Sequence, residues 1–138
     1  TVYYGDEVGL TGGDDPYNRM PYPWADLGGQ PDMTLRADFK ALLKLRQEKP
    51  VLRRGQLSAP LLSTANSMVL TRHTGDAQVL MAFNNSDQIQ THTFTAPTAL
   101  LKRQGTMWWG QGTVKIHGKE MTITIPAMSG WIWGASSN

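Results

Sequence analysis

The hydrophobic pattern first predicts one helix. Between Asp32 and Lys49, apolar residues recur at i, i+4, i+7 and i+8, which is the spacing of one face of an α-helix. Pro50 ends the pattern, and either Asp32 or Thr34 is suited to cap its start. The apolar residues of this face are Leu35, Phe39, Leu42 and Leu43.

After Pro50 the pattern changes to short runs of alternating apolar and polar residues, which is typical of strands with one buried face. Two hairpins are predicted. The first joins residues 67–74 to residues 77–83 across the turn Gly75-Asp76. The second has its turn at His117-Gly118 and pairs the apolar residues Val114 and Ile116 with Met121, Ile123 and Ile125. Three further runs are interpreted as strands: 89–96, 98–103 and 130–135. About seven short strands at this spacing indicate an antiparallel β-sandwich.

The residues before the helix form a short apolar run and a long loop. Thr1–Tyr4 shows no polar alternation, as expected of a strand covered on both faces of a parallel sheet. Residues 5–31 contain six glycines and four prolines, too many for a regular element. Because one strand and one helix cannot form a sheet, this part is predicted to be the end of a larger α/β domain.

Charge and composition separate the same two parts, residues 1–50 and 51–138. The first has six basic and eight acidic side chains, and the second has seven basic and three acidic side chains. The basic residues of the second part are scattered and do not form the stripe that binds nucleic acid, so a nucleic-acid partner is not expected. Of the 138 residues, 40% are hydrophobic, and no apolar run is long enough to predict a membrane span. The chain has no cysteine, which leaves the compartment open between the cytoplasm and the periplasm or exterior.

The loop holds the carboxylates considered for chemistry. A glycosidase needs two carboxyl groups roughly 5 to 10 Å apart, but charged loop residues are ordinarily solvated or bound to backbone amides. No catalytic residue is therefore assigned. Calcium is the one cofactor that these ligand types admit, although their spacing does not match an EF-hand. The carboxylates are Asp6, Glu7, Asp14 and Asp15.

Asp15 and Arg19 stand four residues apart around Pro16. If the segment turns once, both side chains point to the same side, where the carboxylate accepts and the guanidinium donates hydrogen bonds to sugar hydroxyls. The alternative interpretation is a salt bridge that only fixes the loop.

The tryptophans raise a similar choice. Trp108 or Trp109 is a candidate for stacking on a sugar, and because neighbouring strand residues face opposite ways, each side is expected to present at most one of them. Trp131 and Trp133 share one face and are assigned to a core or domain interface. Three isolated histidines lack the spacing of metal ligands: His73, His92 and His117.

The opening residues YYGDE and GLTGGDDPYNRMPYPW resemble the end of the catalytic barrel in the α-amylase family, glycoside hydrolase family thirteen, in particular its neopullulanase, cyclomaltodextrinase and maltogenic amylase branch. In that family the eighth barrel strand ends in a YYG-D-E-x-G motif, a loop with D-P-x-x-R follows, and the last barrel helix contains L-x-x-L-R. The helix here reads FKALLKLRQEKPVLRRGQL, so the resemblance is dense over residues 1–57. The AQVLMAFNNS strand continues it.

The resemblance implies a mainly β fold class: a C-terminal antiparallel Greek-key β-sandwich, preceded by the last strand, loop and helix of a TIM (β/α)8 barrel. It implies retaining hydrolysis of α-1,4-glucosidic bonds in cyclodextrins, pullulan or maltodextrins, by carboxylates on barrel segments that this chain does not contain. The chain alone is thus expected to be inactive. Asp15 and Arg19 match the family's sugar-binding loop pair. The expected partners are an α-glucan or cyclodextrin and the missing N-terminal barrel of the same enzyme.

Two other interpretations stay open. A non-catalytic carbohydrate-binding or interaction β-sandwich module would use Trp108 or Trp109, although the density of barrel-end residues argues against it. A purely structural domain that shields the barrel is compatible with the resemblance and applies to residues 52–138.

Overall fold

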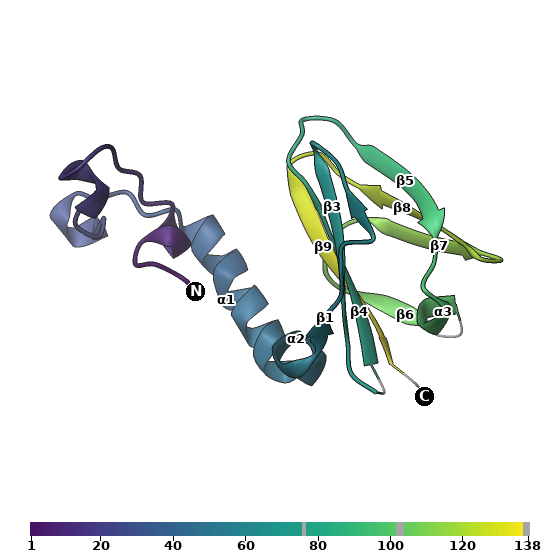
Figure 1. Ribbon diagram of the computed structural model, residues 1–138. Helices are drawn as coiled ribbons and strands as arrows, with labels where there is room; N and C mark the ends of the chain where they lie inside the picture. The colour runs from purple at the N-terminus through teal and green to yellow at the C-terminus, as the bar shows by residue number, and fades with distance from the viewer. Residues whose placement is uncertain (76, 102–103, 137–138) are drawn as a thin grey trace. The chain divides into compact units, whose positions relative to one another are not determined.

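The computed structural model describes residues 1–75, 77–101 and 104–136. The chain divides into two compact units, Thr1–Leu45 and Arg46–Asn138. The first unit contains a loop and most of a long helix, and the second contains two sheets (Figure 1). The division of the chain into domains at residue 50 stays a prediction.

The first unit has three single-turn helices before the long helix α1. Asp32 caps α1, because its Oδ1 accepts hydrogen bonds of 2.9 Å from the backbone N–H groups of both Thr34 and Leu35. Thr1–Tyr4 forms no strand, since none of the described residues pairs with it. The helices are η1 Asp6–Val8, η2 Tyr17–Arg19, η3 Ala25–Leu27 and α1 Met33–Glu48, so the predicted helix is confirmed.

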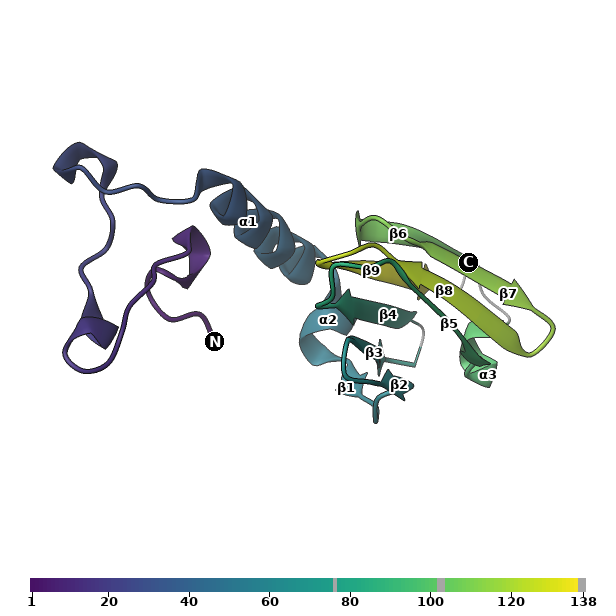
Figure 2. The same cartoon turned by 90° about the horizontal axis from the view of Figure 1, so that it is seen from above.

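The second unit contains two antiparallel sheets (Figures 1 and 2). The larger has the order β1-β3-β4-β9-β6, with β2 also paired to β3, and the smaller has the order β5-β8-β7. The predicted sandwich and both hairpins, β3 with β4 and β7 with β8, are confirmed. The elements are α2 Pro50–Arg54, β1 Gln56–Leu57, β2 Leu62–Ser63, β3 Ser67–His73, β4 Ala77–Asn84, β5 Gln90–Thr95, α3 Thr98–Leu101, β6 Gly105–Gly110, β7 Thr113–His117, β8 Glu120–Ile125 and β9 Ser129–Ser136.

A second prediction of a strand is also wrong. The run 98–103 was expected to be a strand, but Thr98–Leu101 forms helix α3, while residues 102–103 and the predicted turn residue Asp76 lie outside the described residues. Pro50 does more than end a helix. It occupies the first turn of α2, where a residue without a backbone N–H is well tolerated.

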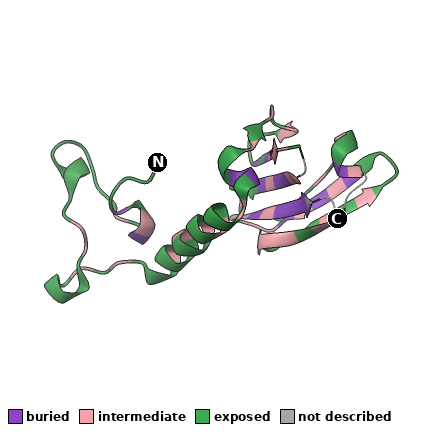
Figure 3. Cartoon of the chain, turned by 90° about the horizontal axis from the view of Figure 1, so that it is seen from below, coloured by how far each residue is buried: buried purple, intermediate pink, exposed green. Residues whose placement is uncertain are grey.

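The core lies between the two sheets. Trp131 is fully buried and Trp133 is 7% exposed, which confirms that this pair belongs to the core. The indole Nε1 of Trp131 donates a 3.0 Å hydrogen bond to the Thr124 carbonyl, so the larger sheet is bonded to β8 of the smaller sheet. In Figure 3 the buried residues concentrate on this unit, and α1 has none. The buried core residues are Val69, Leu80, Ala82, Ala96, Leu100, Met121, Ile123, Ile125, Trp131, Trp133 and Ala135.

Asn84, at the end of β4, clamps three segments together. Its side chain is buried, and its Nδ2 donates hydrogen bonds to the carbonyls of Gln88 at 2.7 Å and Pro126 at 2.9 Å. Its Oδ1 accepts from the backbone N–H and the hydroxyl of Ser86, at 2.9 and 2.8 Å. One side chain thus ties the loop after β4 to the end of β8.

We expect Asn84→Ala to lower the free energy of unfolding by about 2 to 4 kcal/mol, because it removes a buried side chain whose hydrogen bonds join the loop after β4 to the end of β8. Urea unfolding of the 138-residue chain measures this. Asn85→Ala is the matched control, since the side chain of Asn85 is exposed, and it should change stability by less than about 0.5 kcal/mol. Equal losses in the two variants would contradict the clamp.

Candidate functional site

Two carboxylates of the loop bind its own backbone. Asp6 Oδ2 accepts a 2.9 Å hydrogen bond from the Tyr3 N–H, and Glu7 Oε2 accepts a 3.0 Å hydrogen bond from the Gly5 N–H. Gly5 has a φ of 90°, and a Cβ there would lie 2.6 Å from the Leu10 side chain, so the turn requires glycine. Asp6 and Glu7 therefore stabilise the turn at η1.

Asp15 and Arg19 are brought together by η2. Arg19 Nη2 donates to Asp15 Oδ1 at 2.9 Å, as the single turn predicted for this segment requires. The side chains are 66% and 72% exposed for Arg19 and Asp15, and neither makes a further hydrogen bond within the described residues. Such an exposed pair contributes about 0 to 1 kcal/mol to stability. The remaining guanidinium donors and the second carboxylate oxygen are free to bind a ligand.

Exposed aromatic rings lie on the same loop, and our sequence reasoning did not consider them. Tyr17, within η2, is 66% exposed, and Trp24 is 57% exposed with its ring centroid 4.5 Å from that of Tyr22. The Tyr4 hydroxyl donates a 2.8 Å hydrogen bond to the Met20 carbonyl and so fixes one side of the loop. The signal was present in the segment YNRMPYPW, because aromatic residues that recur in a polar loop cannot all join a core.

Strand β6 has a bulge at Trp108, where its register with β9 shifts. Trp109 lies opposite Ile132, whose neighbours in β9 point into the core, so Trp109 is on the outer face of the larger sheet. Trp108 lies against Gly134, which is also on the outer side. The expectation that the two indoles face opposite sides is therefore wrong, because the bulge breaks the alternation.

Trp108 is not an open platform for a sugar. The Nζ of Lys49 lies 4.7 Å from the ring centroid, a cation–π contact. The indole also packs so closely on Gly134 that a Cβ there would lie 1.9 Å from its ring atoms. Trp108 therefore has a packing role in this structure.

The three histidines do not form a metal-binding cluster within the described residues. Within the described ranges, no three His, Asp or Glu side chains lie close enough together to hold a metal ion. His73 Nδ1 lies 3.4 Å from Ser58 Oγ, and the Nε2 of His92 is buried without a hydrogen-bond partner. Among the helices that the structure describes, none is both long and apolar enough to cross a membrane.

Known proteins resemble almost the whole chain. Amylopullulanase of Thermoanaerobacterium saccharolyticum is 31% identical over 94% of this chain and 11% of its own length, and neopullulanase 2 of Thermoactinomyces vulgaris is 30% identical over 95% and 22%. The crystal structure of a Nostoc punctiforme debranching enzyme matches with a TM-score of 0.78 and 29% identity, over 96% of this chain and 27% of the other. No family model matches the chain.

Over almost all of its length, the chain is similar to the C-terminal part of members of the α-amylase family. Within it, the similarity extends to the branch with neopullulanases, cyclomaltodextrinases and maltogenic amylases, as the sequence motifs predicted. An Anoxybacillus α-amylase, at 23% identity and a TM-score of 0.80 over 99% of this chain, shares the fold. The chain spans only a part of these relatives. It covers 11% and 22% of the lengths of the two curated relatives, and 28% and 27% of the chains in the Anoxybacillus and Nostoc structures.

If Trp108 packs on Gly134 as described, Gly134→Ala should destabilise the chain by about 1 to 3 kcal/mol through overpacking. In a Trp108→Ala background the same change should cost less than about 0.5 kcal/mol, because the clashing ring is gone. Thermal unfolding of the two single variants and the double variant measures the coupling. Additive losses would contradict the packing role.

Proposed function

We propose that this chain is the C-terminal part of a longer α-glucan hydrolase whose catalytic carboxylates belong to an upstream barrel. Residues 1–50 would supply the end of that barrel and a loop that binds the glucan, and residues 51–138 an accessory β domain. The proposed substrates are cyclodextrins, pullulan or maltodextrins, hydrolysed at α-1,4 bonds with retention. The names of the relatives, amylopullulanase, neopullulanase and cyclomaltodextrinase, support this class of substrate.

The small core of the first unit favours the proposed upstream barrel, because a unit with few buried residues needs another part of the protein to cover it. Only Gly5 and Val8 are buried in it, and α1 has no buried residue. The apolar face of α1 is left half-buried at Leu35, Phe39 and Leu42. Helices of a (β/α)8 barrel cover such a face by packing it on the strands.

The Asp15–Arg19 pair is the observation that carries the substrate-binding proposal. In barrel enzymes the loops after the strands build the active site, and in the proposed longer protein this pair would project from the loop after the last barrel strand. A carboxylate that accepts and a guanidinium that donates match the donors and acceptors of a glucosyl unit. The pair is exposed and already at 2.9 Å, so a sugar hydroxyl meets groups that are in place before it binds.

Because the proposal assigns the acid and the nucleophile to the upstream barrel, we expect the purified 138-residue chain to release no reducing sugar from maltodextrin above a buffer blank. A reducing-end assay at several protein concentrations measures this. Hydrolysis that is abolished by Asp6→Asn or Glu7→Gln would show that these carboxylates are catalytic and would overturn the proposal for this chain.

In the longer protein, Arg19→Ala should remove about 1.5 to 3 kcal/mol of transition-state interaction, since charge-assisted hydrogen bonds to the sugar are lost. That corresponds to about one to two decades in kcat/KM. The loss should be largest for maltodextrins long enough to reach the pair, and small for short ones.

Arg53→Ala is the matched control, because Arg53 is an exposed arginine of α2 outside the loop, and it should leave kcat/KM unchanged. If Arg19→Ala instead lowers Tm and reduces kcat/KM equally for all chain lengths, the pair only fixes the loop. That result would contradict the proposed role of the pair in substrate binding.

A further inference from the structure

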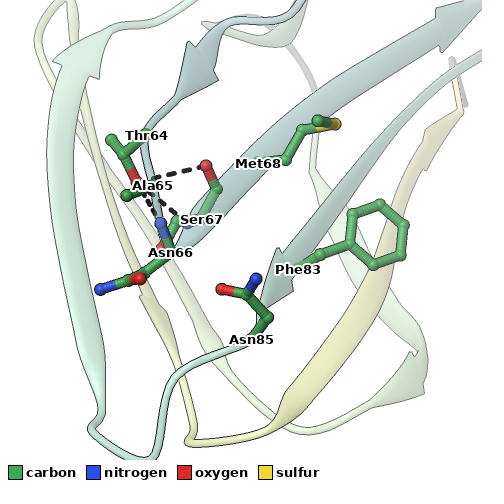
Figure 4. A pocket seen from close by; sticks show the side chains of 7 residues that line it. All are labelled: Thr64, Ala65, Asn66, Ser67, Met68, Phe83 and Asn85. Carbon is green, nitrogen blue, oxygen red and sulfur yellow. Dashed lines mark hydrogen bonds between the residues drawn. The ribbon is translucent and has the colours of Figure 1, made fainter.

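A hollow in the second unit offers no charged group to a ligand. It lies beside Met68 of β3 and Phe83 of β4, which are directly opposite each other in the larger sheet (Figure 4). These two side chains are 41% and 46% exposed, and none of the seven residues that line the hollow is charged. Its volume of about 260 Å³ is below the roughly 300 to 1,000 Å³ of pockets for small ligands. The charge-assisted hydrogen bonds of the proposed function are therefore sought in the loop of the first unit.

Arg19 lies in a segment that has little order of its own. Helix η2 is a single turn, and the Arg19 N–H donates a 3.2 Å hydrogen bond to the Pro16 carbonyl within it. A single turn fixes several backbone angles for each hydrogen bond that it makes, so it is marginal by itself. The next residue, Met20, is already extended, with φ −61° and ψ 144°. The position of Arg19 therefore depends on contacts from outside η2.

The side chain of Tyr4 makes such a contact. Its hydroxyl donates a 2.8 Å hydrogen bond to the Met20 carbonyl, across 16 positions in the sequence. Among the hydrogen bonds of the described residues, this is the one that joins residues 16–31 to residues 1–10. It acts on the residue that directly follows Arg19.

The backbone on both sides of Tyr4 is itself fixed. The Tyr3 N–H donates to Asp6 Oδ2 at 2.9 Å, and the Gly5 N–H donates to Glu7 Oε2 at 3.0 Å. Hydrogen bonds to ionised carboxylates are about twice as strong as those between neutral groups. The two carboxylates therefore hold the residue whose hydroxyl reaches across the loop.

This contact bears on ligand binding because a loop that is ordered only by its ligand loses conformational freedom when the ligand binds, which weakens affinity. A segment that is held beforehand loses less. The Asp15–Arg19 pair adds little order of its own, since both side chains are largely in water. The hydrogen bond from Tyr4 is thus suited to fix the backbone beside Arg19 before a sugar arrives.

We propose that Tyr4 is a positioning residue: its hydroxyl holds the Met20 carbonyl and thereby keeps Arg19 in place for a glucosyl unit of the α-glucan. The role of Arg19 as a sugar ligand rests on the proposed function. Tyr4 itself touches no substrate in this role, because it acts through the backbone beside Arg19. Asp6 and Glu7 support it from the turn at η1.

Trypsin measures the order of this segment in the 138-residue chain, because it cleaves the bond after Arg19 and cleavage follows local opening. Tyr4→Phe removes only the hydroxyl and should speed this cleavage about two- to tenfold, as expected for one lost hydrogen bond. Peptide mass spectrometry over time measures the rate. Cleavage after Arg36, an exposed residue of α1, should be equally fast in all variants.

Tyr3→Phe is the matched control. The Tyr3 ring centroid lies 4.7 Å from that of Tyr4, but the Tyr3 hydroxyl has no hydrogen-bond partner among the described residues. Its loss should leave cleavage after Arg19 unchanged. Equal rates of this cleavage in the two variants would overturn the proposal.

In the longer protein, Tyr4→Phe should lower kcat/KM about two- to tenfold for maltodextrins long enough to reach Arg19, and leave it unchanged for short ones. In an Arg19→Ala background, Tyr4→Phe should have no further effect, because the group that it positions is gone. Equal losses in the two backgrounds would overturn the proposal, since a tyrosine that only stabilises the loop acts independently of Arg19.

The two assays separate this proposal from the proposed function. Suppose that Tyr4→Phe speeds cleavage after Arg19, while Arg19→Ala changes no kinetic constant of the longer protein. That result would support the contact from Tyr4 and refute sugar binding by Arg19. A lower kcat/KM in Arg19→Ala with no change in Tyr4→Phe would support the proposed function and overturn the role of Tyr4.

Discussion

The larger sheet carries apolar side chains on both faces, and the second unit has only one smaller sheet to cover them. The covered face becomes the core around Trp131, sealed by its hydrogen bond to Thr124 and by the Asn84 clamp at the end of the sheets. Among the residues that the structure describes, only the short helix α2 packs on the other face, over Val79. Apolar area removed from water is the main source of folding free energy. The sandwich core of the unit is therefore formed, whereas apolar side chains on the other face of the larger sheet stay partly exposed.

The first unit has the same character. It contains an ordered loop, organised by Asp6, Glu7 and the Asp15–Arg19 pair, and a helix whose apolar face is only half-buried. Both units thus combine local order with uncovered apolar area. The chain is similar to α-amylase-family proteins and spans only 11% to 22% of the two curated relatives, and both features are those expected of one part of a larger molecule.

Local patterns predicted most of the fold. The i, i+4 spacing defined α1, and alternation with turn dipeptides defined β3, β4, β7 and β8, because these signals depend on neighbours in sequence. Three features were not predictable in this way. The run 98–103 is too short for periodicity to separate a strand from α3, the bulge at Trp108 depends on pairing with β9, and the aromatic side chains of the loop have no periodic signal at all. Asp15 and Arg19 were identified because four residues around a proline define a local geometry.

The bulge at Trp108 has a consequence for how this strand tolerates insertions and deletions. If β6 paired with β9 without the bulge at its present length, Trp109 would lie opposite Trp131, on the side already filled by Trp131 and Trp133. Loss of the extra residue at position 108 would instead keep Trp109 opposite Ile132, on the outer face. The strand is therefore expected to tolerate a deletion at the bulge better than a shift of its register with β9.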